Sequence, residues 1–375
     1  MRPFSEPDPG TAAAADGRAA PRRRALVVLN SGLGNSVMSA PLLAVLGERL
    51  NIDCTVLGLP LPGDLLPSLN PARPVAGEPG LPPLWRRFRP RDWDDILAFL
   101  HGRGIDLVIN LRKHDPAKDG AYFAFRDRAA REQITCWDLH APPGGGGGPQ
   151  PFAREAMGLF RRHAGDLPDG DWRWLAGTRR PPEQPVAGLF LGASTSLKRW
   201  TVRSWAGLVG QLRAARPSLR ISVSTGAGEE EIALLDELVA RCAPGAFEVR
   251  HLAGVDELVR WVGSLSVLVT GDTATVHIAA AQGVPGVGLY FSTLASIWGP
   301  GAAAPGFTLL QSPIGRLCPG MQVNGTCTRM YTGCPAPCRL GIGVRSVRSA
   351  TLERLERAGA GVPARSCAAG RVTTR

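Results

Sequence analysis

Three side chains that could do chemistry stand close together in LVTGDTATVHIAAAQGVP, residues 268–285. The apolar run that ends at Gly271 predicts a buried strand, and Asp272 or Thr273 is suited to cap the helix that follows. Thr273 and His277 are four residues apart, so they share a helix face near its positive end. A diphosphate there would meet backbone N–H groups, a hydroxyl and an imidazole. The plainer alternative is a capping Asp272 and a partly buried His277 whose hydrogen bonds are satisfied.

A second polar stretch, LGASTSLKRWTVRSW at residues 191–205, also follows a predicted strand. It presents Ser194 and then two cations, Lys198 and Arg199. Two cations at a strand end could neutralise a departing phosphate. A solvated basic loop with Trp200 pinned in the core explains the same residues.

The third stretch, STGAGEEE at residues 224–231, leads from a strand through a glycine turn to acids that begin a helix. Acids at a helix N-terminus stabilise the helix dipole, which is enough to explain them. Alternatively, Glu229 or Glu230 binds ribose hydroxyls, as acids after Rossmann-type strands can. All three stretches lie where a parallel strand is predicted to end, which is the expected layout of a nucleotide site.

Alternating strands and helices must position these residues. In the second half, we expect helices at VRSWAGLVGQLRAARP, EEEIALLDELVARC, VDELVRWVGSL and TATVHIAAAQG, and strands at VAGLFLGAS, RISVSTG, SVLVTGD and, as the last one, PGVGLYF. Strands that alternate with helices predict a parallel sheet with right-handed crossovers.

The first half shows the same alternation. Its predicted strands are RALVVLN (24–30), DCTVLGL (53–59) and IDLVINL (105–111), and its predicted helices cover residues 35–50 and 91–104. Pro41 lies inside the first helix, so we expect a kink or a late helix start there.

A proline-rich segment, TRRPPEQP at residues 178–185, separates the two halves. The predicted fold is α/β with two Rossmann-like domains that face a central cleft, where the ligand binds at the carboxyl ends of the strands. The expected division is a disordered lead-in, an N-terminal domain, a C-terminal nucleotide-binding domain, and a terminal helix with a tail, at residues 1–23, 24–178, 185–345 and 346–375.

The charge balance limits the partners. The formal net charge is +11, from 43 Lys and Arg against 32 Asp and Glu. A basic surface suits phosphorylated ligands, an anionic membrane surface or nucleic acid. We expect no nucleic acid, because no known module is recognisable and there are only three tyrosines for base stacking.

The sequence shows no recognisable targeting signal. No apolar run approaches the roughly 18–20 residues that span a bilayer. Residues 1–24 lack the apolar core of a signal peptide. We therefore expect a cytoplasmic protein, for which peripheral contact with the inner face of an anionic membrane is permitted.

Several motifs together resemble glycosyltransferase family nine, the heptosyltransferases. They are GASTSLKRW, VTGDTATVHIAAAQGVP with LYFSTLASIWGP after it, and LVVLNSGLGNSVMSAPLLAVL near the start. The resemblance covers residues 24–340 and is more specific in the second half. It implies the GT-B fold and the inverting, metal-independent transfer of heptose from ADP-heptose to lipopolysaccharide core. It also implies that the first domain holds the acceptor, a glycan or a lipid-linked glycan, and that no cofactor is needed.

The resemblance assigns a donor site to residues of the three stretches: Ser194, Lys198, Glu229, Glu230, Asp272, Thr273, Ala274 and His277. Lys198 matches the lysine that contacts the donor phosphates. Ala274 replaces the glycine of the family's Asp-Thr-Gly-x-x-His element. Glu229 or Glu230 matches the acid that holds the adenosine ribose.

Asn35 is the important departure from the family pattern. Relatives have Gly-Asp where this chain has Gly34 and Asn35, and their aspartate takes the proton from the acceptor hydroxyl. An amide has no useful basicity near neutral pH. Three explanations for the missing aspartate stay open. His114 or Asp115 in INLRKHDPAK supplies the base, the acceptor ionises readily, or the protein binds the donor without turnover. The catalytic candidates are thus Asn35, Lys198 and Asp115.

Arg112 and Lys113, in the same stretch, are candidates for holding an anionic acceptor. The cations are placed after a strand of the predicted acceptor domain. An exposed charged loop is the plainer interpretation of these residues and of their neighbours.

Four of the eight cysteines cluster late in the chain, at Cys318, Cys327, Cys334 and Cys338. Only the last pair has the spacing of a zinc knuckle, and the other spacings fit no standard finger. We expect free thiols, with a structural zinc as the alternative, and no metal at the catalytic site.

The sequence thus predicts a glycosyltransferase that moves a heptose or a related sugar from an ADP-sugar to a lipopolysaccharide-core-like or other glycan. The first alternative is a sugar-nucleotide-binding protein that lacks turnover because of Asn35. The second is a glycosyltransferase that acts on a small-molecule glycoside.

Overall fold

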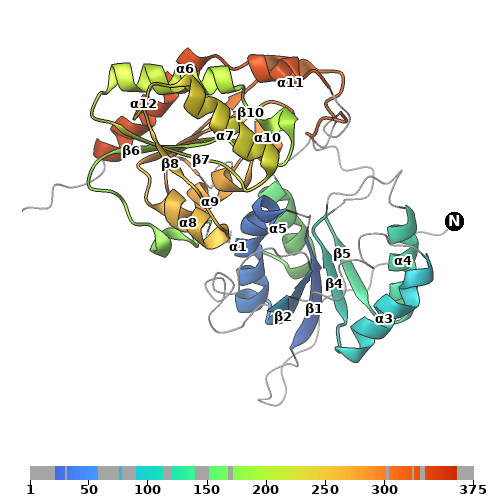
Figure 1. The fold of residues 1–375 in the computed structure, drawn as a ribbon. Helices are drawn as coiled ribbons and strands as arrows, with labels where there is room; N and C mark the ends of the chain where they lie inside the picture. The colour runs from blue at the N-terminus through green and yellow to red at the C-terminus, as the bar shows by residue number, and fades with distance from the viewer. Residues whose placement is uncertain are drawn as a thin grey trace, which may run out of the picture.

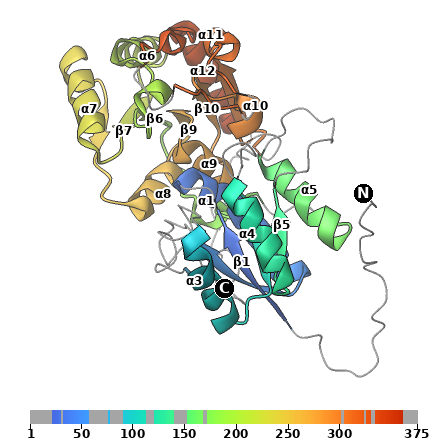
Figure 2. The same cartoon turned by 90° about the vertical axis from the view of Figure 1, so that its right-hand side faces the viewer.

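The computed structural model describes residues 22–29, 32–57, 76–77, 90–112, 120–139, 152–167, 172–300, 304–322, 325–329 and 334–360. They form two α/β domains, each built around a parallel sheet with helices on both faces (Figures 1 and 2). The predicted fold class is confirmed.

The N-terminal domain has a sheet in the order β3-β2-β1-β4-β5. Its strands are β1 (Arg23–Val28), β2 (Ile52–Leu57), β3 (Ala76–Gly77), β4 (Leu107–Asn110) and β5 (Thr135–Asp138). Its helices are α1 (Leu33–Arg49), the 3-10 turn η1 (Pro90–Asp92), α3 (Trp93–Gly102), α4 (Gly120–Arg131) and α5 (Phe152–Ala164).

Strand β1 shows why this sheet is covered on both faces. Ala25 and Val27 pack in one core cluster with α1 and α5, whereas Leu26 and Val28 pack in another with α3 and α4. Successive side chains of a strand point to opposite faces, so an unbroken apolar run needs helices on both sides.

The C-terminal domain has a sheet in the order β11-β10-β9-β6-β7-β8. Its strands are β6 (Val186–Phe190), β7 (Arg220–Ser224), β8 (Glu248–Arg250), β9 (Val267–Gly271), β10 (Gly286–Tyr290) and β11 (Phe307–Gln311). Its longer helices are α6 (Val202–Ala215), α7 (Glu229–Arg241), α8 (Val255–Gly263), α9 (Ala274–Gln282) and α12 (Val344–Ala360). Its shorter helices and 3-10 turns are η2 (Ala176–Thr178), η3 (Ser196–Lys198), α10 (Ala295–Trp298), α11 (Pro313–Leu317) and η5 (Pro337–Leu340).

The order of these strands reverses beside β6, since β7 and β8 lie on one side of it and β9, β10 and β11 on the other. A crevice forms at the carboxyl ends of parallel strands where the order reverses, and ligands bind there. The three polar stretches of the sequence follow β6, β7 and β9, which meet at this point.

Some expected elements differ from the structure. PGVGLYF is not the last strand, because β11 follows it at the sheet edge. Helix α1 begins at Leu33 and contains Pro41, so the late start is wrong. The short strands β5 and β8 and the helices α4 and α5 were not predicted.

The two domains meet where α1 of the first contacts α9 of the second (Figure 1). Gly34 makes this approach possible, because a Cβ there would lie 3.2 Å from His277 Cδ2 and 3.4 Å from Ala274 Cα. The connecting segment is bonded to the same helix: Arg179 Nη1 donates to the Gly283 carbonyl (2.9 Å). The beginning of α1 is therefore held against the beginning of α9.

Candidate functional site

A cavity of about 460 Å³ lies between the domains. One wall is the beginning of α1, and the other is the carboxyl edge of the C-terminal sheet with the segments that follow β6, β9 and β10. Seven of the residues singled out in the sequence line it: Asn35, Ser194, Lys198, Asp272, Thr273, Ala274 and His277. The fold thus brings the glycine turn formed by Gly32 and Gly34, near the start of the chain, to the predicted donor residues.

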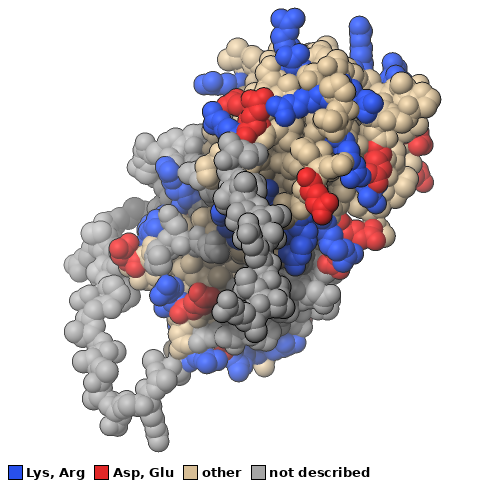
Figure 3. All heavy atoms as spheres, turned by 90° about the vertical axis from the view of Figure 1, so that its left-hand side faces the viewer, with Lys and Arg blue, Asp and Glu red and all other residues tan. Residues whose placement is uncertain are grey.

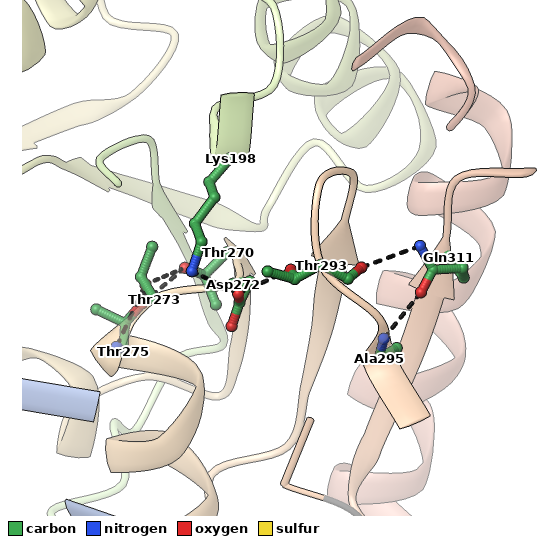
Figure 4. A network of polar contacts seen from close by, with 8 residues as sticks. All are labelled: Lys198, Thr270, Asp272, Thr273, Thr275, Thr293, Ala295 and Gln311. Atoms are coloured by element: carbon green, nitrogen blue, oxygen red, sulfur yellow. Dashed lines mark hydrogen bonds and ion pairs between the residues drawn. The ribbon is translucent and has the colours of Figure 1, made fainter. Parts of the chain in front are cut away.

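A buried ion pair holds the cation of this cavity in place (Figure 4). Lys198 Nζ donates to Asp272 Oδ2 at 2.7 Å, and Thr293 Oγ1 donates to the same oxygen at 2.8 Å. The Lys198 side chain is 18% exposed and that of Asp272 is 7% exposed. An ammonium fixed in this way keeps donors for an anionic ligand, while its carboxylate partner offsets the cost of its burial.

Thr273, and not Asp272, caps helix α9. Its Oγ1 accepts a hydrogen bond from the Thr275 N–H at 3.3 Å, and Thr270 Oγ1 lies 2.6 Å from Thr275 Oγ1 (Figure 4). The N–H groups of a first helical turn have no partner inside the helix, and the helix dipole makes this end positive. Because Asp272 does not cap, its carboxylate is available to hold Lys198.

His277 is buried in the wall of the cavity, and its Nδ1 has no hydrogen-bond partner in the described part of the chain. The alternative of a satisfied histidine therefore does not hold. Burial lowers the pKa of His277 to about 4, with a smaller raising effect from Asp272 and a lowering effect from Lys198. The imidazole is neutral near pH 7, so it offers one donor and one acceptor instead of a charge.

Glu231 is the acid that lines the cavity, and the sequence interpretation missed it. Its carboxylate covers Gly192 and Gly226, where a Cβ on either glycine would overlap the carboxylate oxygens. Glu229 is not among the lining residues. Glu230 is absent from that lining as well, and its Oε2 accepts from Arg199 Nη1 at 2.8 Å.

The position of Glu231 in its helix explains this difference. Helix α7 has Gly228 as its N-cap, so Glu231 is the third helical residue. A side chain at that position reaches back over the helix N-terminus, as in a capping box, whereas the first two point away. The glycines at the ends of β6 and β7 are the sequence signal that could have identified it, because they leave space for a carboxylate.

Asn35 belongs to the opposite wall, in the first turn of α1. Gly32 precedes this helix with φ +110°, a conformation that favours glycine. Among the described residues that line the cavity, the only carboxylates are Asp272 and Glu231, and both come from the C-terminal domain. The described residues of the wall that contains Asn35 include no acid.

Of the predicted acceptor-binding pair, the structure describes only Arg112. Arg112 follows β4, and its backbone N–H donates to Asn110 Oδ1 at 3.3 Å. It is not among the lining residues. Lys113, His114 and Asp115 lie outside the described residues.

The four late cysteines gather beside the C-terminal domain. A Cβ at Gly320 would lie 3.4 Å from Cys327 Sγ and 3.6 Å from Cys318 Sγ. Burial raises the pKa of Cys338, and the nearby thiols of Cys334, Cys327 and Cys318 raise it further. Cysteines of the described segments are free, and no three His, Cys, Asp or Glu side chains within those segments are arranged to hold a metal ion.

None of the helices in the described ranges is both long and apolar enough to cross a bilayer.

Part of the chain is similar to a known protein family. Residues 166–312 match the model of glycosyltransferase family 9 (heptosyltransferase). No curated protein sequence matches the chain.

Three glycosyltransferases are among the solved structures that share its fold. Heptosyltransferase WaaC of E. coli with ADP has a TM-score of 0.60 at 15% identity, over 88% of this chain and 99% of WaaC. ADP-heptose lipopolysaccharide heptosyltransferase II of E. coli has a TM-score of 0.57 at 18% identity, over 89% of this chain and 99% of that protein. A family 9 glycosyltransferase from Veillonella parvula has a TM-score of 0.59 at 15% identity, over 89% and 97%.

The similarities to solved structures establish the GT-B fold. The matched segment contains Lys198, Glu231, Asp272 and His277, which form the C-terminal wall of the cavity. Residues 166–312 are therefore similar to glycosyltransferase family 9, and the chain shares the fold of solved heptosyltransferase structures.

Proposed function

We propose that the protein transfers a heptose, or a related sugar, from an ADP-sugar to a glycan such as a lipopolysaccharide core. The observation that carries this proposal is the cavity between the domains, which combines a buried cation, a helix N-terminus and a carboxylate. The similarity to WaaC, a heptosyltransferase whose structure is described with ADP, supports adenine as the base of the donor.

The donor would lie along the C-terminal wall. Lys198 and the first turn of α9 would hold the diphosphate, because both present positive charge or N–H donors to the cavity. Glu231 would accept hydrogen bonds from the ribose hydroxyls, and the glycines beneath it would let the ribose approach. Neutral His277 would add a hydrogen bond without adding charge.

The reaction would be a single displacement at the anomeric carbon. The acceptor oxygen attacks this carbon from the side opposite the diphosphate, the bond from the carbon to the phosphate oxygen breaks, and the anomeric configuration inverts. The electron pair of that bond passes to the diphosphate, where Lys198 and the α9 N–H groups stabilise the developing charge. No metal is assigned to this step.

The proton of the acceptor hydroxyl must pass to a base. Asn35 lies on the acceptor side of the cavity, where its amide can orient a hydroxyl by hydrogen bonding but cannot deprotonate it. Asp115 or His114, in the segment after β4, is our candidate for the base. Arg112 and Lys113 would bind an anionic acceptor near it.

A second candidate function is the binding of a sugar nucleotide without turnover. Asn35 favours it, because the N-terminal wall supplies no acid to the described part of the cavity. A third keeps the transfer and replaces the glycan by a small-molecule glycoside, whose recognition the N-terminal domain would determine.

Calorimetry with ADP, UDP, GDP and ADP-heptose tests the donor assignment. We expect selective binding of ADP and ADP-heptose that is lost in Lys198→Ala and kept in Arg203→Ala, a cation exposed on the neighbouring helix α6. Equal binding of all three nucleotides, or none, would remove the donor assignment. Transfer to purified core oligosaccharide then separates the enzyme from the binding protein, with Asn35→Asp as the variant that restores an acid.

A further inference from the structure

Exposed apolar side chains concentrate on two short elements of the C-terminal domain. The large hydrophobic residues that are exposed in the described chain are Ile232, Val239, Ile314, Leu317 and Leu340. The last three lie on α11 and η5, which contact each other, and Leu317 is 80% exposed. We call Ile314, Leu317 and Leu340 the α11–η5 patch.

The fold holds these side chains outward. Ser312 Oγ accepts from the Gly315 N–H (3.2 Å) at the start of α11 and donates to the Cys338 carbonyl (2.7 Å) in η5. Arg339 Nε donates to the Arg199 carbonyl at 2.6 Å, which ties η5 to the body of the domain. Because these elements are braced against each other, the exposure of the leucines is a property of the fold.

The segment that contains the patch is basic and has no acid. The sequence has no Asp or Glu between Asp272 and Glu353, although this interval contains five arginines: Arg316, Arg329, Arg339, Arg345 and Arg348. Figure 3 shows one face of the molecule, on which red acidic and blue basic side chains intermingle. Arg316 directly precedes Leu317, and Arg339 directly precedes Leu340. Apolar side chains next to arginines suit a surface that has phosphate groups above hydrocarbon.

We propose that the α11–η5 patch docks the protein on an anionic lipid bilayer. Leu317 and Leu340 would enter the boundary between headgroups and acyl chains, and the arginines would contact lipid phosphates. A protein partner would be expected to offer acids to the arginines and a shaped apolar recess, whereas a bilayer requires only the apolar protrusion and the positive charge. This proposal does not depend on the reaction that the cavity performs.

The sheet topology places the patch beside the cavity. Helix α11 follows the carboxyl end of β11, which neighbours β10 and, beyond it, β9 with Asp272 at its end. Neighbouring strands are about 4.8 Å apart, so the patch and the cavity lie along one edge of one sheet. Docking would bring that edge to the membrane surface, and with it an acceptor anchored in lipid.

Vesicle flotation of the full chain tests the proposal. We expect binding to vesicles of phosphatidylglycerol and phosphatidylethanolamine, a weaker association with pure phosphatidylcholine, and a loss of affinity at high salt. Leu317→Ser with Leu340→Ser should weaken binding by at least about tenfold, since each buried leucine contributes that much. Arg316→Gln with Arg345→Gln should weaken it by about fivefold per arginine.

The matched control is Ile232→Ser with Val239→Ser, which removes the exposed hydrophobics of α7 and should leave flotation unchanged. The proposal is overturned if the wild type does not float with anionic vesicles, or if both patch variants float as well as it does. Sedimentation velocity tests whether a second copy of the chain occupies the patch instead. A wild-type dimer that dissociates in the Leu317→Ser, Leu340→Ser variant would make the patch a self-interface and overturn membrane docking.

Discussion

The two walls of the cavity differ in what they contribute to it. The C-terminal wall has a lysine paired with a buried carboxylate, a capped helix N-terminus, a neutral histidine and an acid above two glycines. The N-terminal wall presents a glycine turn and the amide of Asn35. The C-terminal wall has the groups that bind a charged ligand, whereas the glycines of the N-terminal wall allow a close approach between the two walls.

This difference separates binding from proton transfer. The residues that would stabilise a departing diphosphate belong to one sheet edge and are fixed by their own hydrogen bonds. The group that would accept a proton has to come from the other domain, whose described segments provide no acid to the cavity. Experiments on the two walls should therefore affect different steps of the reaction.

Lys198→Ala should give the largest effect. Removing the cation leaves the carboxylate of Asp272 buried with Thr293 as its remaining described donor, and it removes the positive charge from the departing phosphate. We expect sugar transfer to fall by about 10²–10³-fold, as for other single donors to a developing anion. Steady-state kinetics with ADP-heptose measures it, and a variant within about threefold of the wild type would contradict the assigned role.

Acidic pH should destabilise the C-terminal domain through His277. Its pKa in the fold, about 4, is below its ordinary value of 6.5, so the unfolded chain binds more protons between these pH values. Stability is therefore lost as the pH falls from 6.5 towards 4, by up to about 3 kcal/mol. Urea unfolding at several pH values should show a smaller decrease in His277→Asn, and equal decreases would refute the shift.

The sequence predicts the two walls of the site to different extents, and the reasons are physical. Lys198, Asp272, Thr273 and His277 could be placed because each lies in the segment that follows an apolar strand, and parallel strands end at one edge. Thr273 and Asp272 could not be told apart as the cap, since both types cap helices. Glu231 was missed because three consecutive acids are equivalent until the start of the helix is known to within one residue.

The fold was predictable where strand and helix signals were strong and less so elsewhere. The long apolar strands around β6 and β9 gave the C-terminal sheet, and the central strands β1 and β4 gave the other. Strand β8, with exposed Glu248 and Arg250, has no apolar period to detect. Strand β11 is an edge strand with one buried residue, Phe307, so its position depends on pairing with β10.

Gly34→Val should test the contact between the walls. The new side chain would press on His277 Cδ2, which lies 3.2 Å from the Cβ position, and separate the beginnings of α1 and α9. Overpacking of this kind costs about 1–3 kcal/mol, so we expect a rise of about tenfold in the KM for the donor. Gly102→Val is the control, because in the described part of the chain no atom outside the neighbouring residues and the helix's own backbone lies within 4 Å of a Cβ there. Unchanged kinetics for Gly34→Val would show that the domains need not meet.

The smallest effects should distinguish neighbouring acids of helix α7. Glu231→Gln removes the charge from the carboxylate above the glycines, and it should raise the Kd for ADP about tenfold, since a hydrogen bond to a charged group contributes about 1.5–3 kcal/mol. Glu230→Gln should leave this Kd within about twofold, because Glu230 is 79% exposed and pairs with Arg199 outside the cavity. Calorimetry of both variants with ADP compares them directly. If Glu230→Gln weakens ADP binding more than Glu231→Gln does, the ribose contact belongs to the second residue of the helix, and the C-terminal wall must rearrange when the nucleotide binds.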